Sequence, residues 1–327
     1  MNIDLILIIV FAILLLLFLI KKRKYIEIQK IVFPILYFVM YKTSFGIKSM
    51  NKISRFFPRT QKFIFSLGYV FGFLFMGLIC YAIIKETINL FLKPEGVPGI
   101  MPVLPIEAKG VFYVPFSYLL ICIIFIAFVH EFCHGIVSRL YNVRVKSSGF
   151  AFLGILLPII PAAFVEPDEK SLVKKKWTQQ LSIFAAGPFS NIICAIIILL
   201  VLSFILTPIA VKFFKSEIKD LADNVQDKTQ LNQYLFSHVG EFIKNPNYGI
   251  TFKIFFWFYG LFYWLFVLNI GIGLFNLIPI GPVDGGRMFH TLVTRFLPQK
   301  TGEKVYGFVS FLFAFLIIYN VVFGFFK

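Results

Sequence analysis

Apolar residues occur along this chain in long, nearly uninterrupted stretches, not in the alternating patterns typical of soluble helices or strands. Six of these stretches are long enough to cross the roughly 30 Å hydrocarbon core of a bilayer as helices. They cover residues 3–20, 63–84, 111–139, 181–211, 252–278 and 305–326. The pattern therefore predicts an all-α polytopic membrane protein with about six transmembrane helices.

Two further apolar stretches do not fit the pattern of a spanning helix. Residues 31–41 are too few to cross a bilayer and include Pro34, so we expect them to lie in the interface or to enter the membrane and return. Residues 149–165 contain glycine and two prolines, which disfavour a continuous helix. Non-helical backbone survives at membrane depth only where protein or a wet cavity satisfies it. We therefore predict a small re-entrant β-hairpin that lines a site.

Composition and charge agree with a membrane protein and argue against a nucleic-acid partner. Of the 327 residues, 59% are hydrophobic and only 15% are charged, which is too few to cover the surface of a soluble domain. The net charge of +16 could attract nucleic acid, but the basic residues flank the apolar stretches and form no separate basic domain. We therefore expect the lipid bilayer, and no nucleic acid, as a partner.

The basic residues also predict an orientation. The first apolar stretch has Asp4 near its start and a basic cluster, residues 21–24, after it, and no small-residue cleavage site follows. We expect an uncleaved span with the N-terminus outside. This orientation places residues 21–62, 139–180 and 279–304 on the cytoplasmic side, where they hold 22 of the 32 lysines and arginines. We predict a multi-pass protein of the cell membrane.

The third apolar stretch contains the motif His130-Glu131-Phe132-Cys133-His134 near its predicted cytoplasmic end. Positions four apart share one face of a helix, so both imidazoles can reach one metal ion. Glu131 beside them is placed to take a proton from a metal-bound water. A purely structural histidine pair is the alternative, but it would leave three ionisable groups in an apolar span. We interpret the motif as part of a zinc site.

Two histidines do not complete a catalytic zinc site, which usually has three protein ligands and one open position. Candidates for the third ligand on the predicted cytoplasmic side are Glu166, Asp168, Glu169, Asp284, His290 and Glu303. We favour Asp284, because it follows the break of the fifth span at Pro279 and Pro282, at the same membrane side as the histidines. The glycines after it allow a close backbone approach. A turn-forming Asp-Gly pair is the structural alternative.

Four sequence elements together resemble the site-2 protease family of intramembrane zinc metalloproteases. Two of them are H-E-x-x-H in one span and N-x-x-P followed by D-G in a later span. The others are G-P-x-x-N at the start of the fourth span and the stretch A-F-V-E-P-D-E, which is similar to archaeal-type members. They lie at residues 130–134, 276–285, 187–191 and 163–169, and the resemblance covers about residues 111–297.

The resemblance also implies roles for individual residues. The ligands of one Zn²⁺ ion would be His130, His134 and Asp284. Glu131 would be the general base. Asn276 matches an asparagine of the family that helps to hold the substrate or the developing oxyanion, and we assign Asn191 to the same group. A helix-capping or packing role is the structural alternative for both asparagines.

The function implied is that of a metalloendopeptidase that cleaves a peptide bond within or near a transmembrane segment of a membrane protein substrate. Two alternatives remain open. Another membrane-embedded metalloprotease class would combine H-E-x-x-H with a downstream glutamate ligand. A non-catalytic metal-binding membrane protein would be a transporter or a silent protease relative. However, the second and sixth spans carry almost no polar residues to line a transport path, and no part of the family's constellation is missing.

We divide the chain into four regions on this basis. Residues 1–62 contain the first span and a basic cytoplasmic segment, and residues 63–110 contain the second span and an external loop. Residues 111–297 form the catalytic core, with an external insert at residues 212–251 that is too short for the PDZ domain of many bacterial members of the family. Residues 298–327 contain the last span.

Overall fold

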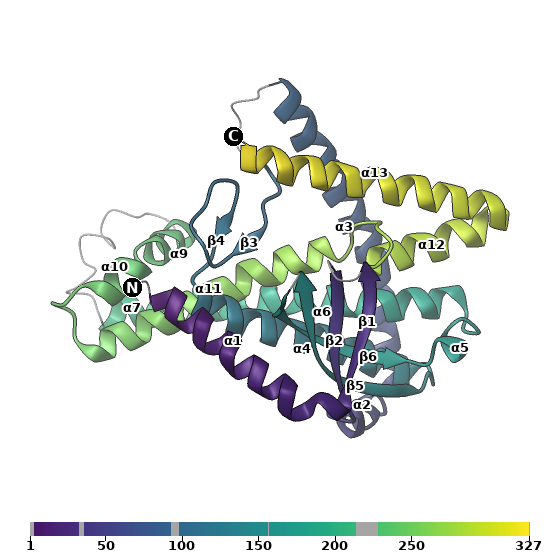
Figure 1. Ribbon diagram of the computed structural model, residues 1–327, viewed down its shortest axis with the longest axis horizontal. Coiled ribbons are helices and arrows are strands. Elements are labelled where there is room, and N and C mark those ends of the chain that lie inside the picture. The colour runs from purple at the N-terminus through teal and green to yellow at the C-terminus, as the bar shows by residue number, and fades with distance from the viewer. Residues whose placement is uncertain (1–2, 33–35, 93–97, 156, 214–227, 327) are drawn as a thin grey trace. The chain divides into compact units, whose positions relative to one another are not determined.

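The computed structural model describes residues 3–32, 36–92, 98–155, 157–213 and 228–326. In these segments, six helices are long and apolar enough to cross a membrane. They are α1 (Ile3–Lys22), α3 (Pro58–Leu92), α4 (Phe116–Leu140), α6 with its continuation (Trp177–Phe213), α11 (Ile250–Phe275) and α13 (Gln299–Phe326) (Figure 1). The prediction of a polytopic membrane protein with about six spanning helices is confirmed.

Shorter elements connect these helices. The π-helical turn η2 (Leu202–Leu206) joins α6 (Trp177–Val201) to α7 (Thr207–Phe213). The other helical elements are η1 (Arg23–Tyr25), α2 (Ile47–Ile53), α5 (Glu169–Leu172), α9 (Lys228–Ser237), α10 (Val239–Lys244) and α12 (Asp284–Phe296). Two short parallel strands, β3 (Val103–Leu104) and β4 (Phe112–Tyr113), precede α4.

Proline residues set several of the helix ends. Proline is tolerated in the first helical turn, where its missing N–H would have no partner, and α3 begins at Pro58. Pro115 precedes α4 in an extended conformation. The fifth apolar stretch continues to residue 278, but α11 ends at Phe275. A proline at 279 has no N–H for the Phe275 carbonyl, and its ring would clash with that carbonyl in a continued helix. The turn after α11 brings the chain back toward α4.

A four-stranded antiparallel sheet contains the predicted hairpin. Its strands are β1 (Ile26–Val32), β2 (Leu36–Thr43), β5 (Val145–Ile155) and β6 (Leu157–Pro167), in the order β1-β2-β5-β6 (Figure 1). The hairpin β5–β6 confirms the expectation for residues 149–165 and extends it at both ends. β6 is an edge strand of this sheet, and it packs against α4.

The second short apolar stretch, residues 31–41, has a partner that the sequence did not reveal. Pro34 lies outside the described residues, but the following strand β2 pairs with β5 from Leu36 opposite Ile155 to Thr43 opposite Ser148. The Thr43 hydroxyl also donates a hydrogen bond of 2.8 Å to the Ser148 carbonyl. We expected an isolated interfacial or re-entrant piece, and the structure shows a strand that extends the hairpin sheet.

The chain forms two compact units. Residues 1–191 and 272–327 make up the first, which contains the sheet, the N-terminal part of α6, α12 and α13. Residues 192–271 make up the second. Within the second unit, Phe242 of α10 packs against Phe256 of α11, with ring centroids 4.6 Å apart. Every candidate site residue lies in the first unit.

Candidate active site

The two histidines of the H-E-x-x-H motif lie on one face of α4. The helix places His130 and His134 one turn apart, and their rings meet edge to face with centroids 4.7 Å apart. Both side chains are buried, and their Nε2 atoms are 3.1 Å apart. At this separation one Nε2 can donate a hydrogen bond to the other, or both can present their lone pairs to one cation.

Asp284 reaches this pair because the chain reverses after α11. The backbone N–H of Gly285 donates a 2.7 Å hydrogen bond to the carbonyl of Asn276, which closes the loop between α11 and α12. A Cβ at Gly285 would collide with the backbone of Leu277, so only glycine fits there. Asp284 is the first residue of α12, and its Oδ2 lies 3.0 Å from Nε2 of His130 and 3.2 Å from Nε2 of His134.

The other acidic or imidazole candidates for the third ligand bind other residues. Glu166 accepts a 2.5 Å hydrogen bond from Ser147, and the ring of His290 lies 3.0 Å from Glu303. Asp168 pairs with Lys146, and Glu169 with Arg287. Among the described residues, His130, His134 and Asp284 are the one group of three such side chains arranged to hold a metal ion. The structure therefore brings together the three residues that the sequence favoured.

The three donor atoms have the separations and the chemistry of a zinc site. Zinc holds imidazole and carboxylate ligands at about 2.0–2.2 Å, so tetrahedral ligands lie about 3.4 Å apart, close to the observed 3.0–3.2 Å. The Nδ1 of His134 lies 2.7 Å from the Ile183 carbonyl, which can only accept. Nδ1 therefore carries the proton, and Nε2 presents its lone pair to the cluster.

The remaining surroundings also fit an ion. Burial favours the neutral form of Asp284, but without an ion, protonated imidazoles of His134 and His130 facing Asp284 would outweigh burial and hold the pKa of Asp284 below its ordinary value. A zinc ion would take the place of those protons, and a carboxylate binds it in the ionised form. Gly187 of α6 faces the same point, since a Cβ there would collide with Nε2 of both histidines. The residues present fit a zinc ion.

Glu131 points from α4 toward the sheet. Its Oε2 accepts a 2.9 Å hydrogen bond from the backbone N–H of Val165 in β6. It also lines a cavity of about 30 Å³ together with residues of β5 and β6, enough room for a water molecule. The hairpin thus positions the carboxylate that the sequence assigned as the general base.

The two asparagines have different surroundings. Asn191 is fully buried in α6, and its side-chain amide lies 3.1 Å from Nδ1 of His130. Asn276 is half-buried, and its side chain donates a 3.0 Å hydrogen bond to the Ile272 carbonyl one turn earlier. Asn191 therefore contacts a candidate metal ligand. The contact of Asn276 is instead of the kind expected from the alternative role, that of a residue that caps or packs a helix.

Three contacts of the site were absent from the sequence analysis. Gly187 belongs to the G-P-x-x-N element, but its approach to the histidines has no signal in the motif itself. Val165 belongs to the A-F-V-E-P-D-E stretch, which overlaps the predicted hairpin. That overlap is the one sequence signal that could have suggested its contact with Glu131. The Ile183 carbonyl carries no sequence signal, because any residue offers the same backbone group.

The comparisons with known proteins agree with this geometry. The model of peptidase family M50 matches residues 118–319, which is more than half of the chain and includes every candidate site residue. This chain belongs to peptidase family M50, the site-2 protease family. As an M50 member with six apolar helices, it is a multi-pass membrane protein of a zinc metallopeptidase family. The resemblance inferred from the motifs is confirmed.

One relative extends the similarity beyond the M50 region. The protein named Uncharacterized protein MJ0971, from Methanocaldococcus jannaschii, is 26% identical over 314 residues. The matched part covers 84% of this chain and 81% of the relative. The similarity to that protein therefore includes residues outside the segment that the M50 family model matches.

Proposed function

We propose that this protein is an intramembrane zinc endopeptidase that cleaves a peptide bond within or near a transmembrane segment of a membrane protein substrate. The observation that carries the proposal is the convergence of three buried donor atoms, 3.0–3.2 Å apart, from His130, His134 and Asp284. Glu131 is the neighbour of His130 in the same turn of α4. Membership in family M50 supports the reaction class.

The roles of the residues follow from their positions. His130, His134 and Asp284 hold the ion, and a bound zinc ion supplies Lewis acidity, which makes water nucleophilic near neutral pH. Glu131 accepts the proton of the attacking water and returns it to the leaving amide nitrogen. The Val165 N–H orients the Glu131 carboxylate through Oε2. Asn276 has a second side-chain N–H, which we assign to the substrate or the developing oxyanion.

The edge strand β6 is suited to hold an unwound substrate. The N–H of Val165 points away from β5 toward α4. Backbone polar groups alternate in direction along a strand, so those of Ala163 and Pro161 point to the same side as those of Val165. Within the described residues, no strand pairs with this edge, and proline is common on edges. We propose that the substrate segment adds to β6 as an extended strand, because its backbone carbonyls are shielded while it remains helical.

We assign the cytoplasmic side to the active site and the cell membrane to the protein. The proposed ligands lie near the C-terminal end of α4 and at the start of α12. Arg139 lies in the last turn of α4, and the connections next to both elements belong to residues 139–180 and 279–304, which together with residues 21–62 hold 22 of the 32 lysines and arginines. This charge distribution supports an N-terminus outside the membrane.

Removal of the metal tests the proposal directly. We expect the purified full-length protein, reconstituted with a model transmembrane substrate, to lose cleavage after treatment with a zinc chelator. Added Zn²⁺ should restore it, and Mg²⁺ should not, because imidazole ligands suit zinc and magnesium prefers oxygen ligands. The measurement is the rate of product formation together with the zinc content of the protein. Cleavage that persists in metal-free protein would contradict the proposal.

Asn191 is proposed as the residue that sets the proton position of His130. The structure places the amide nitrogen of Asn191 3.1 Å from Nδ1 of His130 and leaves the buried amide oxygen without a partner. Nitrogen and oxygen of an amide are assigned from such contacts, and we propose the flipped amide, whose oxygen accepts the Nδ1 proton. His130 then presents the lone pair of Nε2 to the ion, as His134 does. This role differs from the substrate contact that the family resemblance suggested.

Replacement of Asn191 by leucine is therefore expected to weaken zinc binding about 10–100-fold, the usual effect of losing such an outer hydrogen bond. Competition of the purified variant with a fluorescent zinc chelator measures the affinity. Asn269→Leu is the matched control, since this asparagine is also fully buried but bonds to Leu265 in its own helix. Zinc affinity equal to the wild type in Asn191→Leu, with only the Michaelis constant for substrate changed, would favour the substrate role instead.

A further inference from the structure

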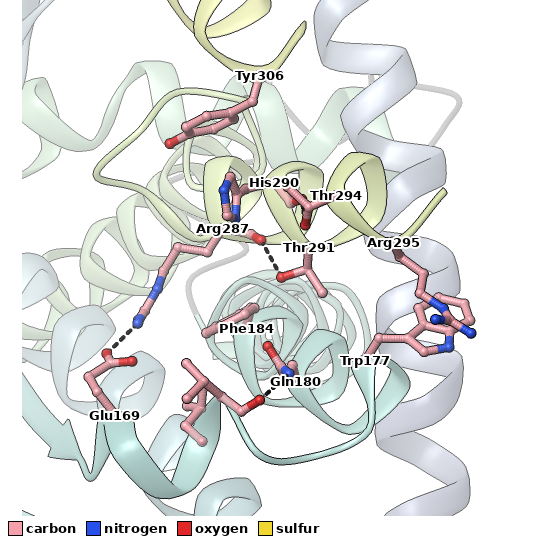
Figure 2. Close-up of a pocket in the computed structure, with 12 residues that line it drawn as sticks. Glu169, Trp177, Gln180, Phe184, Arg287, His290, Thr291, Thr294, Arg295 and Tyr306 are labelled. Carbon is pink, nitrogen blue, oxygen red and sulfur yellow. Dashed lines mark hydrogen bonds and ion pairs between the residues drawn. The ribbon is translucent and has the colours of Figure 1, made fainter. Parts of the chain in front are cut away.

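A second cavity lies outside the metal cluster, between α5, the start of α6, α12 and the start of α13. Its volume is about 470 Å³, and Figure 2 shows the side chains that line it. Arg287, Thr291 and Arg295 follow one another at four-residue spacing, so they share the face of α12 that borders the cavity. Trp177 lines it from α6, and Tyr306 from α13. The proposed function makes no use of this cavity.

The two arginines have different partners. Arg287 pairs with Glu169 and lies 4.5 Å above the ring of Phe184, which holds its guanidinium in place (Figure 2). Arg295 is exposed, and no ion pair is found for it within the described part of the chain. The segment Lys174–Lys176, just before α6, adds three more cations. A free guanidinium beside a basic segment attracts an anion, and its planar fork suits a phosphate group.

The starts of two candidate spans border the cavity, and this is the level where we expect lipid headgroups. Trp177 is the first residue of α6, and α13 starts at Gln299, so two candidate spans begin beside the cavity. Tryptophan is enriched at this level of membrane proteins, where one part of the ring is apolar and the N–H is polar. Phe296 packs edge-on against Trp177 yet is 67% exposed, and Val173 at the rim is 63% exposed. These apolar surfaces suit the acyl part of a lipid.

We propose that this cavity binds the phosphate group of an anionic membrane lipid. Arg295 contacts the phosphate, the segment Lys174–Lys176 supplies the surrounding positive potential, and the acyl chains lie along Phe296 and Val173. Basic pockets between membrane helices on the cytoplasmic side recognise anionic headgroups in this way. Because α12 begins at Asp284, a bound lipid would also hold the helix that carries the third proposed metal ligand; only this consequence rests on the proposed function.

Native mass spectrometry of the full-length protein in detergent tests the proposal. We expect phosphatidylglycerol to remain bound at concentrations where phosphatidylcholine does not, because only the former has a net negative headgroup. Arg295→Gln should lower the affinity for phosphatidylglycerol roughly tenfold, the effect of losing one charge-assisted contact. Arg59→Gln is the matched control, because it removes the same charge from an exposed site at the start of α3 that does not line the cavity.

Four outcomes overturn the proposal. Equal binding of both lipids would exclude recognition of the anionic headgroup, and equal losses in Arg295→Gln and Arg59→Gln would indicate attraction by overall charge. If inorganic phosphate bound with the same affinity as phosphatidylglycerol, the site would be assigned to a free anion. Binding of a soluble glutamate-rich peptide without lipid binding would assign it to an acidic peptide. The measurement is of lipid binding alone, so this test is independent of the proposed catalytic function.

Discussion

Replacing Glu131 by glutamine is expected to abolish peptide cleavage while the protein keeps its zinc. Glutamine has nearly the same shape and can still accept the hydrogen bond from the Val165 N–H, but it cannot take up a proton. Loss of a general base lowers the rate about 10²–10⁴-fold. The ligands His130, His134 and Asp284 are unchanged, so one zinc ion per chain should remain. Cleavage of a model transmembrane substrate and elemental analysis measure the two quantities.

Glu166→Gln is a suitable control for this variant. Glu166 is also a glutamate near Glu131, but it lies in β6 and bonds to Ser147 of β5 and Lys42 of β2. The hydroxyl of Ser147 and the ammonium of Lys42 lower the pKa of Glu166, and both bonds tie its carboxylate to the sheet. We expect Glu166→Gln to keep most of the activity. Cleavage at the wild-type rate by Glu131→Gln would refute the assignment of the base.

Replacing Asp284 by alanine is expected to remove both zinc and activity. Its Oδ2 is one of the three donor atoms, and its loss leaves two imidazoles, which is one ligand fewer than catalytic zinc sites usually have. We expect less than one tenth of the wild-type zinc content after dialysis, measured by elemental analysis. Circular dichroism and thermal unfolding of Asp284→Asn, which preserves the shape of the side chain, separate ligand loss from loss of fold.

His290→Ala and Glu303→Ala provide the matched controls, because these residues pair with each other at 3.0 Å outside the metal cluster. Both variants should keep their zinc. If a glutamate variant lost the metal while Asp284→Ala retained it, the third ligand would be that glutamate. The site would then resemble those of metalloproteases that use a downstream glutamate ligand. Zinc retained in all of these variants would contradict the three-ligand site itself.

Much of the site could be predicted from the sequence because it depends on short-range geometry. The spacing of His130 and His134 fixes them on one face of any helix, whatever surrounds it. The length of each apolar stretch predicts a spanning helix, because the bilayer thickness sets the length required. Charge topology placed all six candidates on the same membrane side. Asp284 was favoured among them because it follows the break of the fifth span and precedes two glycines, and the structure brings it to the histidines.

Contacts between distant segments could not be predicted in the same way. The pairing of β2 with β5 joins residues more than 100 positions apart, and no periodicity in either segment encodes the partner or the register. Likewise, the contact of Asn191 with His130 depends on how α6 packs against α4. The G-P-x-x-N element marked Asn191 as important but left its function open, since an amide can serve a substrate, a helix end or a ligand equally well.

The sequence by itself determined the class of the protein, its spanning segments, the face of α4 that carries both histidines, and the family to which it belongs. These properties follow from apolar length, helical spacing and motif composition, which are local. Only the tertiary structure decided which carboxylate meets the histidines, which groups set their proton positions, and which strand faces Glu131. Those properties depend on the close packing of segments far apart in the chain, where a single backbone group or a missing Cβ, as at Gly187, determines what fits.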